Sequence, residues 1–221
     1  MWILPTRGRP ERCQQALDSI AAAETTTPGV VSVGGDIDPA YEQLKLPADW
    51  RIEFSDQPAL CPRLNDVFER NRDEPWYGLL NDDFIVETAG WDVKLSAAAG
   101  RHNMASFDDG WVSAQNPILT INTFGGDLVR ALGWLVLPGV KHLYADNLWH
   151  DLARALGNHV HCDDVKIEHR HHMNGKAPID ATYQAGIACQ PEDERVYHAF
   201  REHGFNDALG RARRCIQGLQ P

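Results

Sequence analysis

The chain has 221 residues, of which 43% are hydrophobic and 24% charged, ordinary values for a globular protein with one core. Its formal net charge of −10 argues against a protein that holds nucleic acid through its overall charge, although it does not exclude a local basic groove. The five cysteines are an odd number without a CxxC pair, which excludes a disulfide framework and favours a reducing cytoplasm.

The sequence shows no signal for export or membrane insertion. A strand-like segment begins almost at Met1, which leaves no room for a signal peptide. The longest apolar stretch, residues 131–140, contains Pro138 and is too short to span a bilayer. We therefore expect a protein without a membrane span, located in the cytoplasm.

The first hundred residues alternate between strand-like and helix-like segments. The order is a strand at 2–5, a helix from Pro10, strands at 30–33 and 51–54, a helix at 62–71, a strand at 76–80 continued at 84–86, and a helix from Gly90. A strand, a helix and a second strand imply a parallel pair with a crossover. This half of the chain predicts an α/β fold with a mainly parallel sheet flanked by helices.

The second half is less regular. We expect weak strands at 105–107 and 111–114, a β-rich segment at 118–124, helices at about 127–133 and 146–156, and mostly helix towards the C-terminus. Residues 160–171 alternate, so that Val165, Ile167, His169 and His171 would share one face of a strand. The absence of repeats and linkers predicts one domain.

The strongest local signal is the acidic end of the strand at 76–80. A run of apolar residues stops abruptly at Asn81-Asp82-Asp83. In an open α/β sheet, ligands bind at the carboxyl ends of the strands. Adjacent carboxylates repel each other unless a cation neutralises them, and oxygen ligands suit Mg²⁺ or Mn²⁺. The same three residues are also typical of a simple polar turn.

Two further signals follow the first and second strands. The turn Pro5-Thr6-Arg7 offers backbone N–H groups and a guanidinium to a phosphate-bearing ligand. Asp36 and Asp38 follow the second strand, where an acid could accept a hydrogen bond from a nucleobase or ribose. An ordinary capped turn is the alternative interpretation in both places.

The last two signals lie in the second half. His169 and His171 could complete a metal site, because imidazole is a common ligand of Mn²⁺ and Zn²⁺, or they could be structural. Asp146 stands at a helix start, where it could act as an N-cap or as a general base that deprotonates an acceptor hydroxyl.

These five signals, in this order, resemble the GT-A glycosyltransferases, especially the inverting family 2 type and its small phage-encoded members. The turn after the first strand and the acid after the second match the family's nucleotide-binding segments. The resemblance therefore assigns nucleotide binding to a set of residues near the strand ends, namely Pro5, Thr6, Arg7, Asp36, Asp38, Asn81 and Asp82.

The family's Asp-x-Asp metal motif corresponds to residues 81–83, so the resemblance makes Asp83 a metal ligand, joined by His169 or His171. Asp146 matches the catalytic base. The metal motif begins with Asn81 instead of aspartate, which puts the role of this residue in doubt. The implied division is a nucleotide-binding part at about 1–95, an acceptor and catalytic part at about 96–185, and a helical tail at about 190–221.

The reaction implied is a single in-line displacement that inverts the anomeric carbon, with Mn²⁺ or Mg²⁺ as cofactor. The resemblance indicates a UDP-sugar donor, whereas the acceptor could be a glycan, a small molecule or a hydroxymethylated base in phage DNA. In the last case the protein would work in the host cytoplasm. Three tryptophans could stack on a sugar face, although core packing is the alternative: Trp91, Trp134 and Trp149.

Three other functions remain open at this point. A metal-dependent hydrolase of phosphoesters or nucleotides could use the same carboxylates and histidines around an activated water. A nucleotidyltransferase shares the sheet and the metal but needs a Gly-rich loop with a lysine, which residues 6–10 lack. A module that binds nucleotide-sugars without turning them over is the non-enzymatic alternative.

Overall fold

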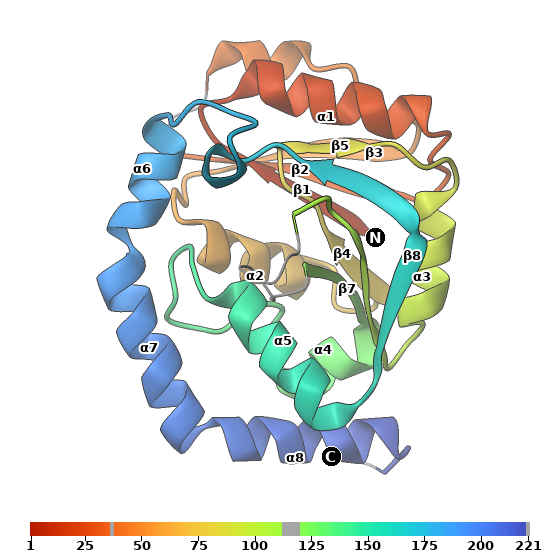
Figure 1. Cartoon of the computed structure of the whole chain (residues 1–221), viewed down its shortest axis with the longest axis vertical. Coiled ribbons are helices and arrows are strands. Elements are labelled where there is room, and N and C mark those ends of the chain that lie inside the picture. The colour runs from red at the N-terminus through yellow and green to blue at the C-terminus, as the bar shows by residue number, and fades with distance from the viewer. Residues whose placement is uncertain (36–37, 112–119, 220–221) are drawn as a thin grey trace.

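The computed structural model describes residues 1–35, 38–111 and 120–219 (Figure 1). The first half contains the elements β1 (Trp2–Thr6), α1 (Pro10–Ala22), β2 (Gly29–Gly34), η1 (Pro39–Gln43), β3 (Trp50–Ser55), α2 (Leu60–Arg70), β4 (Trp76–Leu79), β5 (Phe84–Val86) and α3 (Trp91–Ala99). The second half contains β6 (Met104–Asp108), β7 (Ile121–Gly125), α4 (Gly126–Leu132), α5 (Ala145–Leu156), β8 (His159–His169), η2 (His172–Asn174), α6 (Ala181–Ala188), α7 (Gln190–His203) and α8 (Phe205–Ile216).

The strands form one mixed sheet in the order β3-β2-β1-β4-β7-β6-β8-β5. The first four strands are parallel to one another, β7 is antiparallel to both β4 and β6, and β8 is parallel to β6. The parallel half is built from strands such as Gly29–Gly34, which is buried throughout because helices cover both faces of the sheet. The predicted α/β fold with its crossover helices is confirmed.

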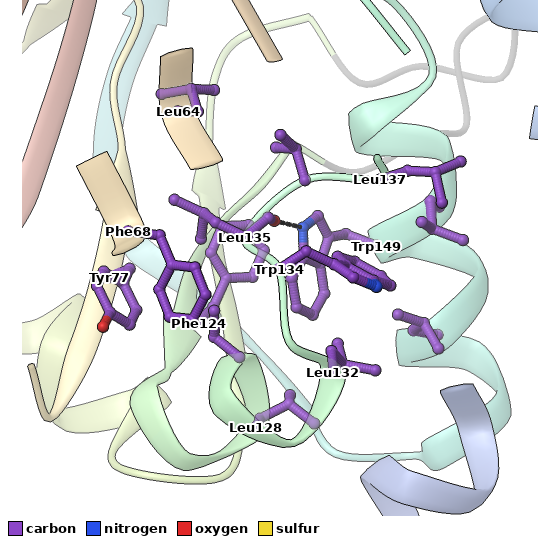
Figure 2. Close-up of a cluster of buried hydrophobic side chains, with 14 of the residues drawn as sticks. Leu64, Phe68, Tyr77, Phe124, Leu128, Leu132, Trp134, Leu135, Leu137 and Trp149 are labelled. Carbon is purple, nitrogen blue, oxygen red and sulfur yellow. Dashed lines mark hydrogen bonds between the residues drawn. The ribbon is translucent and has the colours of Figure 1, made fainter. Parts of the chain in front are cut away.

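Each face of the sheet has its own apolar core. On β1, Trp2 and Leu4 pack into the core under α1 and α3, whereas Ile3 packs on the other face. That second core lies between the sheet and the helices α2, α4, α5 and α8, and Figure 2 shows its centre around Phe124, Trp134 and Trp149. The two faces together fix the positions of the strand ends, where the predicted site residues lie.

Two predicted strands differ from the structure. Residues 84–86 do not continue β4, because the chain turns at 81–83 and β5 pairs antiparallel with β8 at the far edge of the sheet. The alternation along β8 is confirmed for Val165, Ile167 and His169, which are all buried. His171 lies beyond the strand, as the N-cap of η2. The candidate strand at 111–114 lies outside the described residues except for Trp111.

The C-terminal helices form an arm along one side of the molecule (Figure 1). The helical segment begins with α6, earlier than the predicted start at about residue 190. The α6–α7 arm, residues 181–203, runs from the neighbourhood of α1 to α8, which packs on α4 and α5. Within the described ranges, no helix combines the length and the apolar character that crossing a bilayer requires.

Candidate active site

A cavity of about 680 Å³ opens at the carboxyl ends of β1 and β4. In an α/β sheet this edge is where ligands are expected. Ten of the residues predicted from the sequence line it, namely Pro5, Thr6, Arg7, Asn81, Asp82, Asp83, Asp146, Trp149, His169 and His171. The structure therefore brings together side chains that are up to 166 positions apart, such as Pro5 and His171 (171 − 5).

The two adjacent carboxylates have different surroundings. Asp82 is buried, and both of its oxygens are already engaged, since Thr6 Oγ1 donates to Oδ2 at 2.8 Å and Arg9 Nη1 to Oδ1 at 3.1 Å. Burial raises the pKa of Asp82 to about 6, against the opposing charge of Arg9. Asp82 thus links the end of β1 to Arg9, and a direct contact with a nucleotide stays a prediction.

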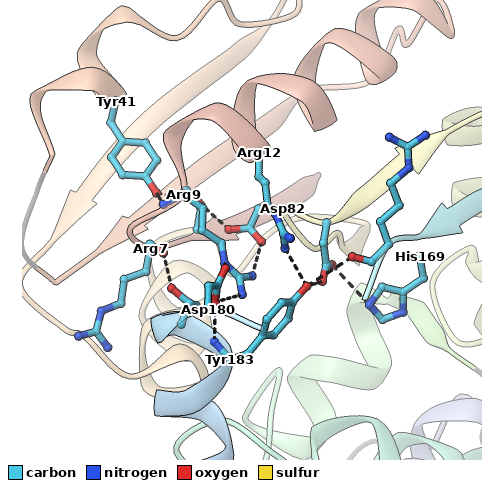
Figure 3. Close-up of polar contacts among 12 residues, drawn as sticks. Arg7, Arg9, Arg12, Tyr41, Asp82, His169, Asp180 and Tyr183 are labelled. Carbon is cyan, nitrogen blue, oxygen red and sulfur yellow. Dashed lines mark hydrogen bonds and ion pairs between the residues drawn. The ribbon is translucent and has the colours of Figure 1, made fainter. Parts of the chain in front are cut away.

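Arg9, in the turn between β1 and α1, was not among the site residues predicted from the sequence. Its guanidinium donates Nε and Nη2 to the two oxygens of Asp180, at 2.8 and 2.7 Å, as well as Nη1 to Asp82 (Figure 3). Burial acts to lower the pKa of Arg9, but the two carboxylates outweigh it and raise the pKa. This fork joins the first turn of the chain to the start of α6, 171 positions later.

Asp83 and His169 lie next to each other in the wall of the cavity. The register of β5 and β8 pairs Phe84 with His169, and Arg170 N donates to the Asp83 carbonyl at 2.8 Å, so the two segments lie side by side. His169 Nε2 lies 3.4 Å from Asp83 Oδ1. Among the described residues neither of these atoms has a hydrogen-bond partner, although both are buried. Buried polar atoms are rarely left unpaired, which points to a ligand between them.

The other oxygen of Asp83 is occupied. Tyr183 on α6 donates its hydroxyl to Asp83 Oδ2 at 2.7 Å. Burial acts to raise the pKa of Asp83, but the polar contacts with the His169 ring and the Tyr183 hydroxyl outweigh it, so the pKa lies below its usual value. Asp83 therefore stays ionised to a lower pH than Asp82.

The Asp83–His169 pair is a partial donor set for a divalent cation. In the part of the chain that the structure describes, no three His, Cys, Asp or Glu side chains converge on one point. Mg²⁺ and Mn²⁺ commonly take one or two protein ligands and complete their shell with substrate phosphates and water. A carboxylate oxygen and an imidazole nitrogen, on two residues that line the cavity, fit that pattern.

His171 has different partners from His169. Its Nδ1 accepts a hydrogen bond from Met173 N at 3.3 Å, and its ring stacks on Trp111 at a centroid distance of 5.1 Å. Burial lowers its pKa to about 4, so the ring is neutral near pH 7. The geometry favours His169 as the closer partner of Asp83, while His171 and Trp111 form an aromatic wall beside it.

Arg7 and Arg63 lie near the ends of β1 and β2. Among the described residues, neither guanidinium has a carboxylate partner. Arg63 is 2% exposed and donates only to the carbonyls of Gln57 and Thr6, and its Nε is unpaired. Burial and the nearby charge of Arg7 lower its pKa to about 10. Gly34 is required here, because a Cβ would lie 1.3 Å from Arg63 Nη1. Arg7 and Arg63 both line the cavity.

Asp146 is exposed to the cavity in the first turn of α5. It is not the N-cap, a position held by Tyr144, and its Oδ1 accepts only from Asn147 N among the described contacts. The loop before α5 is held by Asp193 of α7, which accepts from three backbone N–H groups at 2.7–2.9 Å (Lys141, His142 and Leu143). The arm thereby holds the loop that leads into the helix of Asp146.

The three predicted sugar-stacking tryptophans belong to the core. Trp91 is 0% exposed, packs against Trp2 and donates its indole N–H to Thr25 Oγ1. Trp134 is also buried and, like Trp91, is not among the described residues that line the cavity. Trp149 reaches the cavity wall but is 1% exposed, because it stacks on Phe124 and donates to the Leu135 carbonyl (Figure 2). The burial of Trp91 and Trp134 argues against contact with a sugar, and Trp111 is a half-buried tryptophan that lines the cavity.

The acids after β2 are not brought into the described cavity. Asp38 is exposed and caps the short helix η1, accepting from Ala40 N at 2.9 Å, which is the capped turn that the sequence left as an alternative. Asp36 lies outside the described residues. The structure thus gives Asp38 a local role, and a nucleotide contact from either acid stays a prediction.

The solved structures that share this fold include two glycosyltransferases. The mannosyltransferase PcManGT from Pyrobaculum calidifontis, in complex with GDP-Man and Mn²⁺, matches 98% of this chain and 73% of its own, with a TM-score of 0.59 and 12% identity. Glucosyl-3-phosphoglycerate synthase from Mycobacterium tuberculosis, in complex with Mn²⁺, UDP and phosphoglyceric acid, matches 86% of this chain and 76% of its own, with a TM-score of 0.56 and 12% identity. No protein-family model matches the chain, and no curated protein matches it in sequence. The likeness shows that the chain has the GT-A fold, as the order of motifs predicted.

Proposed function

We propose that this protein is a metal-dependent glycosyltransferase that moves a sugar from a nucleotide diphosphate donor to an acceptor hydroxyl. The observation that carries the proposal is the pair Asp83 Oδ1 and His169 Nε2. These buried atoms lie 3.4 Å apart at a cavity wall, without hydrogen-bond partners among the described residues. Both structural neighbours are complexes with Mn²⁺ and a nucleotide or nucleotide-sugar, which supports this interpretation.

Asp83 and His169 would hold Mn²⁺ or Mg²⁺. When bound, such an ion supplies positive charge that neutralises the leaving diphosphate. Asp82 does not compete for this place, because Thr6 and Arg9 already engage its oxygens. The pairing of Asp82 with Arg9 also offsets part of the repulsion between the two neighbouring carboxylates.

The anionic part of the donor would meet Arg7 and Arg63. A buried arginine is normally paired with a carboxylate, and Arg63 has only backbone carbonyls as described partners. Guanidinium groups bind phosphate oxygens in a bidentate way, and the cavity is open to both arginines. Pro5 and Thr6 would form the wall against which the nucleoside lies.

Asp146 would act as general base. It is exposed to the cavity, and no cation is paired with it among the described ion pairs, so it is free to accept the proton of an acceptor hydroxyl. Attack of that hydroxyl on the anomeric carbon, opposite the diphosphate, would invert its configuration. Both the inversion of the anomeric carbon and the role of Asp146 as general base are parts of this proposal.

The proposal also concerns the nucleobase of the donor and the identity of the acceptor. One neighbour holds UDP and the other GDP-Man, so a UDP-sugar is our first choice and a GDP-sugar the second. Neither neighbour is described as acting on DNA. A hydroxymethylated base is therefore only one of the acceptors to be tested, beside glycans and small molecules.

The test measures nucleotide binding by isothermal titration calorimetry. UDP and GDP are titrated into the protein with and without Mn²⁺, for the parent, Asp83→Ala and the control Asp163→Ala, whose carboxylate is 91% exposed. We expect Mn²⁺-dependent binding that Asp83→Ala abolishes and Asp163→Ala retains. Asp146→Asn should bind like the parent but lower turnover about 10²–10⁴-fold.

Binding that is equal without metal and in Asp83→Ala would contradict the metal site. Release of free sugar that never depends on an acceptor, in a parent that passes the binding test, would favour the hydrolase. Tight binding without turnover on any acceptor would favour a binding module. Each result thus selects a different one of the functions that share this cavity.

A further inference from the structure

Tyr183 connects the α6–α7 arm to the proposed metal ligand. Its hydroxyl donates to Asp83 Oδ2 at 2.7 Å, and Arg12 Nη1 donates to the same hydroxyl at 2.8 Å (Figure 3). The tyrosine is 7% exposed. It was not among the residues predicted from the sequence, because a single tyrosine in a short helix carries no motif.

The direction of this hydrogen-bond chain is fixed by its chemistry. A guanidinium can only donate, so Arg12 must use a lone pair of the Tyr183 oxygen. The phenol has one proton, and Asp83 Oδ2 at 2.7 Å is much closer to it than the Arg170 carbonyl at 3.4 Å, so that proton points to Oδ2. The order Arg12 to Tyr183 to Asp83 therefore has one arrangement of protons.

The ring of Tyr183 is also held in place. The guanidinium carbon of Arg9 lies 3.8 Å from the ring centroid, and the rings of His171 and His172 pack against it at 4.6 and 4.5 Å. A ring enclosed by a cation and two imidazoles cannot swing its hydroxyl away from Asp83 without losing these contacts.

The consequence falls on the two oxygens of Asp83. Oδ2 is occupied by the phenol, whereas Oδ1 faces His169 Nε2 and forms no hydrogen bond among the described residues. A carboxylate with both oxygens free could rotate or bind an ion through both oxygens. Because Oδ2 is hydrogen-bonded to Tyr183, only Oδ1 remains for an ion.

We propose that Tyr183 is a positioning residue that makes Asp83 a one-oxygen metal ligand directed at His169, with Arg12 setting the polarity of its hydroxyl. This inference rests on the proposed function, because it assumes a divalent cation at Asp83. Outer-shell partners of this kind change metal affinity about 10–100-fold when removed.

A merely structural role for Tyr183 would be to anchor α6. Two other contacts anchor the same segment, since Asp180 pairs with Arg9, and Thr182 Oγ1 donates to the Arg7 carbonyl at 2.9 Å. Tyr183→Phe removes one oxygen and leaves both anchors and the ring packing. We therefore expect the variant to fold with its arm in place.

The experiment follows Mn²⁺ binding by electron paramagnetic resonance, in the presence of saturating UDP. Tyr183→Phe is compared with the parent and with Tyr197→Phe. Tyr197 is a matched control, because its hydroxyl also donates to a carboxylate, Asp151, and lies on the same arm but is not among the described cavity residues. We expect Tyr183→Phe to weaken Mn²⁺ binding about 10–100-fold and Tyr197→Phe to leave it unchanged.

Arg12→Leu provides a second, milder variant, because it keeps the phenol but removes the donor that sets its direction. It should weaken Mn²⁺ binding less than Tyr183→Phe. Parental affinity in Tyr183→Phe, or an equal loss in Tyr197→Phe, would overturn the inference and leave the metal site standing. If the parent itself shows no Mn²⁺ binding that depends on Asp83, the proposed function fails, and the role of Tyr183 fails with it.

Discussion

Helix α1 and the α6–α7 arm both flank the cavity, but they are held to the molecule in different ways. The buried residues of α1 are Pro10, Cys13, Ala16, Leu17 and Ile20, a nearly continuous apolar stripe at helical spacing. The buried residues of the arm are Tyr183, Gly186 and Asp193. The first region is held by buried apolar residues, whereas the second combines polar contacts with the half-buried side chains of Val196, Tyr197 and Phe200, which pack on the core.

The difference decides how each region is coupled to the site. Apolar contacts are not directional, so small changes in the packing of α1 leave the strand ends where they are. The contacts of the arm are directional and reach the site itself, since Asp193 holds the loop before Asp146 and Asp180 holds Arg9. We therefore expect changes in the first region to alter stability, and changes in the arm to alter both stability and ligand binding.

The largest effect is expected from Trp91→Ala, in the core under α1 and α3. The fully buried indole packs on Trp2 at a centroid distance of 4.3 Å, and its loss should lower the free energy of unfolding by about 3–5 kcal/mol. Urea denaturation measures this change. The folded variant should bind UDP and Mn²⁺ like the parent, and weakened binding would show that the core couples to the cavity after all.

An intermediate effect is expected from Asp193→Ala in the arm. Three backbone N–H groups would lose their acceptor, which should lower the free energy of unfolding by about 3 kcal/mol, as measured by urea denaturation. The freed loop should also reduce turnover. Glu202→Ala, at a position of α7 that is 75% exposed, is the control and should change neither quantity. A loss of stability with parental turnover would break the proposed link between the arm and Asp146.

The smallest effect is the coupling between Arg9 and Asp180, measured by a double-mutant cycle with Arg9→Met and Asp180→Asn. The bidentate pair is partly exposed, so we expect a coupling of about 1 kcal/mol at pH 7. Burial acts to raise the pKa of Asp180, but Arg9 outweighs it and lowers the pKa. The stabilisation is therefore present above the usual pKa of about 4 and disappears as the pH falls below it.

The exposed pair Lys94–Asp164 offers a reference cycle, for which about 0.5 kcal/mol or less is expected. Equal coupling energies in the two cycles would mean that the Arg9–Asp180 pair behaves as an ordinary surface ion pair. A larger value for Arg9–Asp180 would support the view that the arm is docked through the site.

Much of the parallel half could be predicted because its signals are local. The apolar runs of β1, β2 and β4 end in polar residues, and the topology of parallel strands brings such ends to one edge. Thr6, Asp82 and Asp83 therefore meet where their sequence positions predict. The separation of Asp82 from Asp83 into a paired and an open carboxylate could not be predicted, because it depends on Arg9 and Tyr183.

The sequence by itself determined the alternation of strands and helices, the acidic end of β4 and the alternating face of β8, because all three depend on neighbours within a few positions. Only the tertiary structure decided which His lies beside Asp83, since that follows from the pairing of Phe84 with His169 at the far edge of the sheet. It also decided that Trp91 is core and that Tyr183 reaches Asp83 across 100 positions. A side chain that acts through a single contact with a residue distant in sequence produces no periodic pattern or motif. Its partner can therefore be identified only from the folded structure.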